Sequence, residues 1–318
     1  MSASTIDSLE PFAIDGTTQW VLLRGDVRPQ RVLLIVQQGP GLPLIHEAAA
    51  IERRLRLESD RVVAYWDQRG TGKSLVADPR TTDLARLVAD VRAMVDALCI
   101  RFDVAHVDVL GLSIGGTLAV MAAAQNPARI GHVVAVGLDV SLAEGERYAY
   151  DFARDEAARR GDRRAQRQLE AIGAPPHDTS KRFLTRVRWA TAYGGIRRGR
   201  GFFGLLGETV WRLLASPHYS LREAVKALRA IEGTQERLLR ALRGLDLRTL
   251  VASYVEALDA PRGKSLVWFD KSAHMPHYEE PERFRDALAF ALASVRSRPA
   301  SAVESSPQLQ SRIDIEAA

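Results

Sequence analysis

The chain has 318 residues, of which 46% are hydrophobic, 26% charged and 7% aromatic; this is typical of a globular protein and excludes collagen-like, coiled-coil and wholly disordered chains. Its single cysteine, Cys99, excludes an internal disulfide and a cysteine metal cluster. The net charge is +5. Because no nucleic-acid-binding module accompanies this charge, we expect no nucleic-acid partner. No apolar run is long enough to span a bilayer and no signal peptide is evident, so we expect a cytoplasmic protein without a membrane partner.

The first 140 residues are rich in short apolar segments. Residues 11–26 predict two antiparallel strands joined by a turn at Asp15-Gly16. Four near-continuous Val/Leu/Ile segments follow, of the kind buried on both faces of a parallel sheet; they cover residues 31–37, 61–67, 106–112 and 132–138. Helical patterns separate these segments. Strands that alternate with helices predict an α/β fold with a mostly parallel, doubly wound sheet.

One of these helical patterns is well defined. Apolar residues recur at three- and four-residue spacing over residues 83–101, which predicts an amphipathic helix packed on the sheet. Thr81 or Thr82 can cap its start.

The rest of the chain differs in composition from this first part. Residues 141–245 are rich in arginine and helical in pattern, which predicts a helical cap inserted into a core formed by residues 1–140 and 246–297. Within the core, residues 265–270 predict a final strand and residues 282–295 a closing helix. Residues 298–318 are rich in Ser, Pro and Ala, which predicts a disordered tail.

A G-x-S-x-G motif lies where a predicted buried strand runs into a helix. In Gly111-Leu112-Ser113-Ile114-Gly115 the two outer glycines allow the backbones that flank a sharp turn to pass closely, and the serine oxygen is exposed at the carboxyl edge of the sheet. The Ile114 N–H, at the helix start, would point at an oxyanion that develops on a substrate. Taken alone, the motif is equally compatible with a simple connecting turn.

Three further segments follow the ends of other predicted strands. They read QGPG at 38–41, DQRGTGKS at 67–74 and SAHMPHYEEPERF at 272–284. Together with GLSIGG, and in this order, they resemble the α/β-hydrolase superfamily, and within it the proline iminopeptidase-like branch. The resemblance covers residues 19–292 and implies an α/β-hydrolase fold with a helical cap.

The resemblance also implies roles for individual residues. Ser113 matches the nucleophile and His274 the general base, for which imidazole has a suitable pKa. His277 is the rival histidine but fits a second, non-catalytic position of the motif. Gly39 lies in the loop that donates the second N–H of an oxyanion hole, beside that of Ile114. We expect Asp67 and Arg69 to shape the site through buried hydrogen bonds and charge pairing, and we expect no metal or cofactor.

Two departures from the family pattern stand out. Gln37-Gln38 occupy the place of the usual His-Gly in the oxyanion loop. In addition, the strand that normally carries the aspartate of the triad has no counterpart between residues 232 and 265. Asp139 and Asp246 both satisfy the chain order serine, acid, histidine, and Asp139 is favoured because it follows a predicted parallel strand.

We therefore expect a serine hydrolase that forms an acyl-enzyme on Ser113 and acts on a short peptide or a small-molecule ester or amide. The alternative is an impaired member of the fold that binds without turnover because its triad lacks an acid. Glu208 and Glu232 are candidates to hold a substrate amine, although either can simply pair with an arginine. The oligomeric state and the substrate are not predicted.

Overall fold

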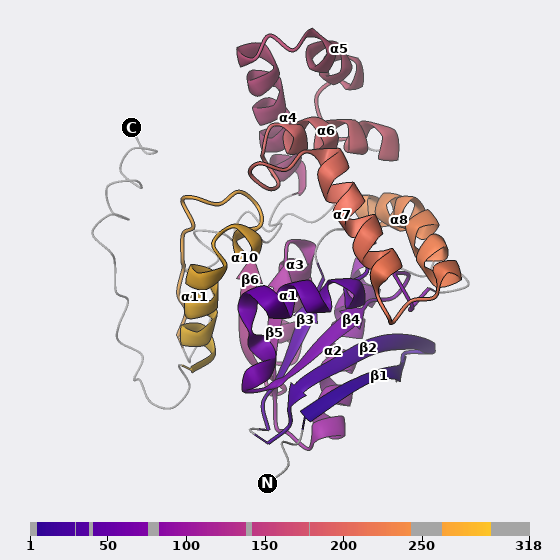
Figure 1. Cartoon of the computed structure of the whole chain (residues 1–318), viewed down its shortest axis with the longest axis vertical. Helices are drawn as coiled ribbons and strands as arrows, with labels where there is room; N and C mark the ends of the chain where they lie inside the picture. Colours follow the sequence, from indigo (N-terminus) through magenta and orange to yellow (C-terminus); the bar gives the residue numbers. More distant parts are fainter. Residues whose placement is uncertain are drawn as a thin grey trace.

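The computed structural model describes residues 5–28, 30–37, 41–75, 83–137, 142–177, 179–242 and 263–293. Six strands form one sheet, β1 (Thr5–Ile14), β2 (Thr17–Asp26), β3 (Val32–Val36), β4 (Val62–Asp67), β5 (Val107–Leu112) and β6 (Ile130–Val136). Their order across the sheet is β1-β2-β4-β3-β5-β6. The β1–β2 and β2–β4 pairs are antiparallel, and the remaining pairs are parallel. The prediction of a mostly parallel sheet that begins with an antiparallel hairpin is confirmed (Figure 1).

The predicted turn joins β1 and β2 at Asp15 and Gly16. Both residues have positive φ, 42° and 73°, which a two-residue hairpin turn requires if the flanking strands are to keep their natural twist. The turn pairs Ile14 with Thr17.

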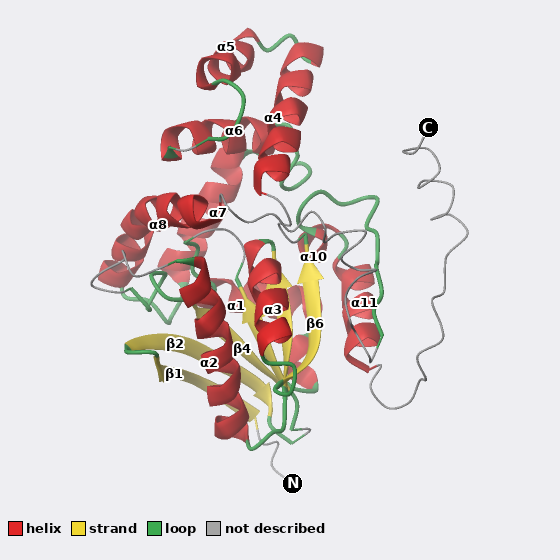
Figure 2. Ribbon diagram, turned by 180° about the vertical axis from the view of Figure 1, so that it is seen from behind, coloured by secondary structure: helices red, strands yellow, loops and turns green. Residues whose placement is uncertain are grey.

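Helices cover both faces of the sheet (Figures 1 and 2). Helices α2 (Leu84–Phe102) and α3 (Ile114–Gln125) pack on one face, and α1 (Ala48–Leu55) and α11 (Pro281–Ala293) on the other. The start of α2 differs from the prediction: Asp83, not Thr81 or Thr82, is the N-cap, and its side chain accepts a hydrogen bond from Arg86 N. The helix therefore begins one or two residues later than the threonines would place it.

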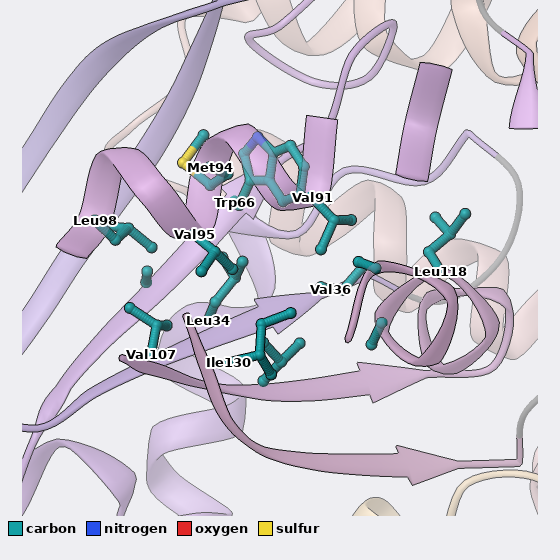
Figure 3. Packing of buried hydrophobic residues seen from close by; sticks show 14 of the residues in the cluster. Leu34, Val36, Trp66, Val91, Met94, Val95, Leu98, Val107, Leu118 and Ile130 are labelled. Carbon is teal, nitrogen blue, oxygen red and sulfur yellow. The ribbon is translucent and has the colours of Figure 1, made fainter. Parts of the chain in front are cut away.

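The main hydrophobic core lies between the sheet and the α2–α3 layer. Side chains from four parallel strands meet those of the two helices there (Figure 3), among them Leu34, Val36, Trp66, Val91, Met94, Val95, Leu98, Val107, Leu118 and Ile130. This packing holds the sheet rigid and so fixes the positions of the residues at its carboxyl edge.

The described part of the segment predicted as a cap contains five helices, α4 (Leu142–Arg159), α5 (Arg163–Ile172), α6 (Ser180–Ala192), α7 (Phe202–Ala215) and α8 (Leu221–Leu242). They lie above the carboxyl ends of the parallel strands (Figure 2). The cap has a small core of its own, formed by α4, α5 and α6 around Tyr150, Ala153, Leu169 and Trp189. No helix in the described part of the chain is both long and apolar enough to cross a membrane.

The strand predicted at residues 265–270 is wrong. This segment has no regular secondary structure before the short helix α10 (Pro276–Glu279), and Leu266, Val267 and Trp268 are 49%, 47% and 57% exposed. A strand is stabilised by a partner strand, and the described sheet ends at β6 without pairing to this segment. The predicted core segment from 246 to 262 and the predicted tail lie outside the described residues.

Candidate active site

Ser113 lies in the sharp turn between β5 and α3. Its backbone has φ 54° and ψ −126°, a conformation that residues with a side chain rarely adopt. A Cβ atom at Gly111 would come within 2.4 Å of Gly115 O, and one at Gly115 within 2.3 Å of Val36 O. Both glycines of the motif are therefore required for the two backbones to pass, as the spacing predicted.

The same close approach brings the start of α3 against the end of β3. A Cβ at Gly115 would also lie 2.5 Å from Gln37 O, and Gln37 is the last described residue before the predicted oxyanion loop. Ile114 is buried at the first position of α3. Gly39 lies outside the described residues. The residues just before it, Val36 and Gln37, contact the start of α3, which carries Ile114.

His274 lies at the carboxyl end of β6, the strand beside β5. Its ring atoms Cε1 and Nδ1 are 3.1 and 3.2 Å from the position that a Cβ would take at Gly137. Ser113 N donates a hydrogen bond of 2.8 Å to Val136 O, on the neighbouring residue. Ser113 and His274 therefore both adjoin residues 136–137, which is the juxtaposition expected from the motifs. Asp139 and Asp246 both lie outside the described residues.

His277 differs from His274 in its surroundings. It is 4% exposed, and its Nδ1 has no hydrogen-bond partner in the described part of the chain. Burial, reinforced by His274 and by the arginines Arg54 and Arg197, lowers the pKa of His277 to about 3, although Glu47 acts in the opposite direction. An imidazole that resists protonation is a poor proton acceptor at neutral pH, which agrees with the assignment of the base to His274.

Asp67 is fully buried at the end of β4 and organises the segment after the predicted oxyanion loop. Its Oδ1 accepts from Leu44 N at 2.7 Å and Ile45 N at 3.0 Å, where the short helix η1 (Ile45–Glu47) begins. Its Oδ2 accepts from Lys73 N at 2.8 Å and from Tyr219 Oη in the cap. The buried hydrogen bonds predicted for Asp67 are confirmed.

Arg69 makes the predicted charge pair. Its Nε and Nη2 donate to the two oxygens of Asp90 at 2.6 and 2.7 Å, and the two side chains are 3% and 0% exposed. Gln19 Nε2 donates to the same carboxylate at 2.8 Å. The pair locks the DQRGTGKS segment to α2 and to the N-terminal hairpin.

A charged cluster that the sequence analysis did not find joins the core to the cap. Glu47, at the end of η1, accepts from Arg212 of α7 and from Tyr278 Oη. Burial opposes ionisation of Glu47, but His46, Arg212 and Tyr278 outweigh it and lower the pKa of this carboxyl to about 2. Burial and Glu47 raise the pKa of Tyr278 well above its usual value.

Glu208, a candidate amine ligand, belongs to the same cluster. Its carboxylate pairs with Arg212 and, at 3.0 Å, with Arg197. Two arginines therefore already neutralise it, as the simpler interpretation of this residue held. The side chain of Glu232, the other candidate, lies outside the described part of the structure.

A cavity of about 470 Å³ lies between the cap and the segment that carries His274. It is lined by Phe152, Tyr193, Gly194, Gly195, Arg198, Gly199 and Ala273. Two aromatic rings and one guanidinium thus stand beside the predicted base, and no acidic side chain is among these lining residues. No group of three His, Cys, Asp or Glu residues within the described ranges could hold a metal ion.

The alpha/beta hydrolase family model matches residues 40–287 of the chain. The chain belongs to this family. The match spans the Ser113 turn and His274, so the fold inferred from the motifs is confirmed, and family membership supports a hydrolase.

This hydrolase is also similar to individual relatives. The probable aminopeptidase YbaC of Bacillus subtilis is 23% identical over 312 residues, which cover 90% of this chain and 96% of the relative. The structure of proline iminopeptidase from Mycobacterium smegmatis matches with a TM-score of 0.56 at 18% identity, covering 90% and 98% of the two chains. A 2-hydroxy-6-oxo-6-phenylhexa-2,4-dienoate hydrolase from Rhodococcus matches with a TM-score of 0.58 at 15% identity, covering 91% and 100%. At these identities the likeness to solved structures shows the fold alone.

Proposed function

We propose that this hydrolase cleaves a small ester or amide through an acyl-enzyme on Ser113, with His274 as the general base. The observation that carries the proposal is the strained turn at Ser113 together with the His274 ring at Gly137. A half-buried serine in the sharp turn after a central strand, with a histidine ring beside the end of the adjoining strand, is an arrangement suited to nucleophilic acyl transfer.

The reaction follows from these positions. Ser113 Oγ attacks the substrate carbonyl carbon while His274 accepts the hydroxyl proton, and the carbonyl oxygen gains negative charge. The N–H groups of Ile114 and Gly39 stabilise that charge. The tetrahedral intermediate then collapses and His274 protonates the leaving group. Water next attacks the acyl carbon while His274 accepts its proton, and collapse of the second intermediate expels Ser113 Oγ, which regains a proton from His274.

We assign the orienting acid to Asp139. The His274 ring presents its Nδ1 and Cε1 atoms to Gly137, and Asp139 follows two residues later in the chain. In a serine triad the acid accepts the Nδ1–H of the histidine and stabilises the imidazolium. Asp246, the other residue with the required chain order, lies outside the described residues, and its role is decided by the experiment below.

The substrate class that we propose is a neutral or anionic acyl compound. The cavity beside His274 has aromatic walls and one arginine, and Glu208 is already paired with two arginines. A protonated substrate amine needs a carboxylate that is not already paired. Aminopeptidase activity on N-terminal proline, which the names of some relatives suggest, is therefore the second candidate.

A serine-directed fluorophosphonate with an intact-mass readout tests the proposal without knowledge of the substrate. We expect one adduct on the wild-type protein and none on Ser113→Ala, whose fold is preserved and whose turnover of an activated ester falls by roughly three orders of magnitude or more. Labelling of Ser113→Ala at the wild-type rate would disprove the nucleophile. An unlabelled wild-type protein would favour the impaired, binding member of the fold.

The same activated ester tests the acid. We expect Asp139→Asn to lower kcat by about 10⁴-fold, because the histidine loses its orienting partner, and Asp246→Asn to retain wild-type turnover. Wild-type activity in Asp139→Asn would exclude Asp139.

A further inference from the structure

Glu279 binds the backbone N–H groups of two residues that line the cavity beside His274. It is the last residue of α10, and its Oε2 accepts from Ala273 N at 2.8 Å while its Oε1 accepts from Arg198 N at 2.7 Å. Both distances are those of strong, charge-assisted hydrogen bonds. One half-buried carboxylate thus uses each of its oxygens on a different segment.

The two segments belong to different parts of the molecule. Ala273 immediately precedes His274, whereas Arg198 lies in the connection between α6 and α7 of the cap. Both residues line the 470 Å³ cavity. The distance across this side of the cavity therefore depends on the Glu279 side chain.

Other contacts reinforce this bridge without duplicating it. Arg198 Nη2 reaches Asp270 O at 3.4 Å, which adds a second, weaker link between the cap and the segment before His274. Ser272 Oγ donates to Glu280 Oε1 at 2.6 Å, and the other Glu280 oxygen accepts from Arg283. Within the described part of the chain, the Glu280 carboxylate therefore holds the same segment through residues that lie outside the cap. Substituting Glu279 removes the bridge to the cap, whereas substituting Glu280 removes only support for the segment before His274. Comparison of the two variants therefore distinguishes the bridge from local support.

We propose that Glu279 is a positioning residue that holds the cap and the His274 segment in one arrangement, so that the seating of the cap over a bound substrate sets the position of the general base. This inference rests on the proposed role of His274. Glu279 touches neither the base nor the reacting atoms in this scheme; it acts through Ala273 and Arg198. A base displaced by even about 1 Å loses much of its rate because proton transfer depends on alignment.

The variant Glu279→Gln tests the bridge directly. Glutamine keeps one acceptor oxygen and presents an NH₂ donor to the other N–H, so at least one of the two hydrogen bonds is lost. We expect the backbone amides of residues 198 and 273 to exchange hydrogen at least about tenfold faster than in the wild-type protein, since each loses a charge-assisted bond or shares a weaker one. Glu280→Gln should leave the amide of residue 198 at its wild-type rate, and Glu282→Gln, an exposed change on α11, should leave both.

Kinetics distinguish positioning from a purely structural role. With a small activated acetate ester, we expect Glu279→Gln to lower kcat about tenfold or more with KM changed less than about twofold, and Glu282→Gln to match the wild type. The conservative variant Glu279→Asp keeps both acceptor oxygens on a shorter side chain and should recover part of the lost kcat. If the melting temperature shows that Glu279→Gln is poorly folded, Glu279→Asp replaces it as the test variant.

The outcomes separate this inference from the proposed function. Wild-type exchange at residues 198 and 273 in Glu279→Gln would overturn the bridge. Faster exchange with an unchanged kcat would overturn the positioning role. If the wild-type protein failed to react with the fluorophosphonate, the proposed function would fall, whereas the exchange experiment would still report whether Glu279 joins the two segments.

Discussion

At the scale of single residues, Asp67 links Tyr219, the DQRGTGKS segment and the start of η1 through four hydrogen bonds. In Asp67→Asn an NH₂ donor replaces one acceptor oxygen, so two of these donors lose their partner in a fully buried place. We expect the free energy of unfolding to fall by about 2–3 kcal/mol and kcat to fall with it, measured by urea denaturation and by turnover of an activated ester.

The matched control for this change is Asp60→Asn. Asp60 pairs with Arg61 at 2.8 Å, but its side chain is 51% exposed, and exposed ion pairs contribute at most about 1 kcal/mol. Equal destabilisation of the two variants would show that Asp67 is not the organising carboxylate inferred here.

His277 makes stability depend on pH. Its pKa is lowered to about 3, so between pH 6.5 and 3 the unfolded chain binds a proton at this residue and the native protein does not. Stability from this group is therefore complete above pH 6.5 and declines as the pH falls, by about 1.4 kcal/mol per unit. Between pH 7 and pH 5 we expect the wild-type protein to lose about 2 kcal/mol more than His277→Gln, measured as the free energy of unfolding in urea at both pH values. Parallel pH profiles would contradict this prediction.

Residues differ in how far sequence alone could place them. Ser113 and His274 stand in motifs whose spacing reflects a local turn and a strand end, so their approach to residues 136–137 was predictable. Glu47 belongs to none of the motifs that the sequence analysis identified. Its partners Arg212 and Tyr278 lie 165 and 231 residues further along the chain. Only the tertiary fold brings that cluster together.

At the scale of elements, the four parallel strands were predicted to within two residues, because strands buried on both faces are continuously apolar. The same criterion failed for residues 265–270. Their apolar run has strand-like composition, yet β-propensity depends on a partner strand and a surface to cover, and this segment has no partner among the described strands.

A pair of identical substitutions measures this difference. Val109 is fully buried in β5, whereas Val267 is 47% exposed. We expect Val109→Ala to lower the free energy of unfolding by about 2 kcal/mol through lost burial and a residual cavity, and Val267→Ala by less than about 0.5 kcal/mol. Urea denaturation of both variants gives the comparison. A large effect at Val267 would mean that residues 265–270 are packed into the sheet.

At the scale of the whole molecule, positive charge is concentrated over the candidate site. Residues 144–243 contain 21 Lys and Arg against 12 Asp and Glu, and this region lies above the carboxyl edge of the sheet (Figure 1). Such a field attracts anionic substrates and repels cationic ones, and salt screens it.

This charge distribution predicts a substrate preference. We expect kcat/KM to be higher for N-acetylproline nitroanilide, which is neutral, than for proline nitroanilide, whose amine is protonated, and we expect added salt to narrow the difference. Neutral short esters should be cleaved better than either. A large preference for the free amine would reverse this prediction and favour an aminopeptidase.

The backbone conformation of Ser113 implies that reactivity and stability oppose each other in this protein. A serine held at φ 54° and ψ −126° raises the free energy of the native state by about 1–3 kcal/mol, whereas a glycine adopts this conformation without a Cβ clash and loses about 0.5–1 kcal/mol of backbone entropy on folding. The difference favours glycine. Ser113→Gly should therefore abolish turnover and yet raise the free energy of unfolding by about 1 kcal/mol, so that the inactive protein outlasts the active one in urea.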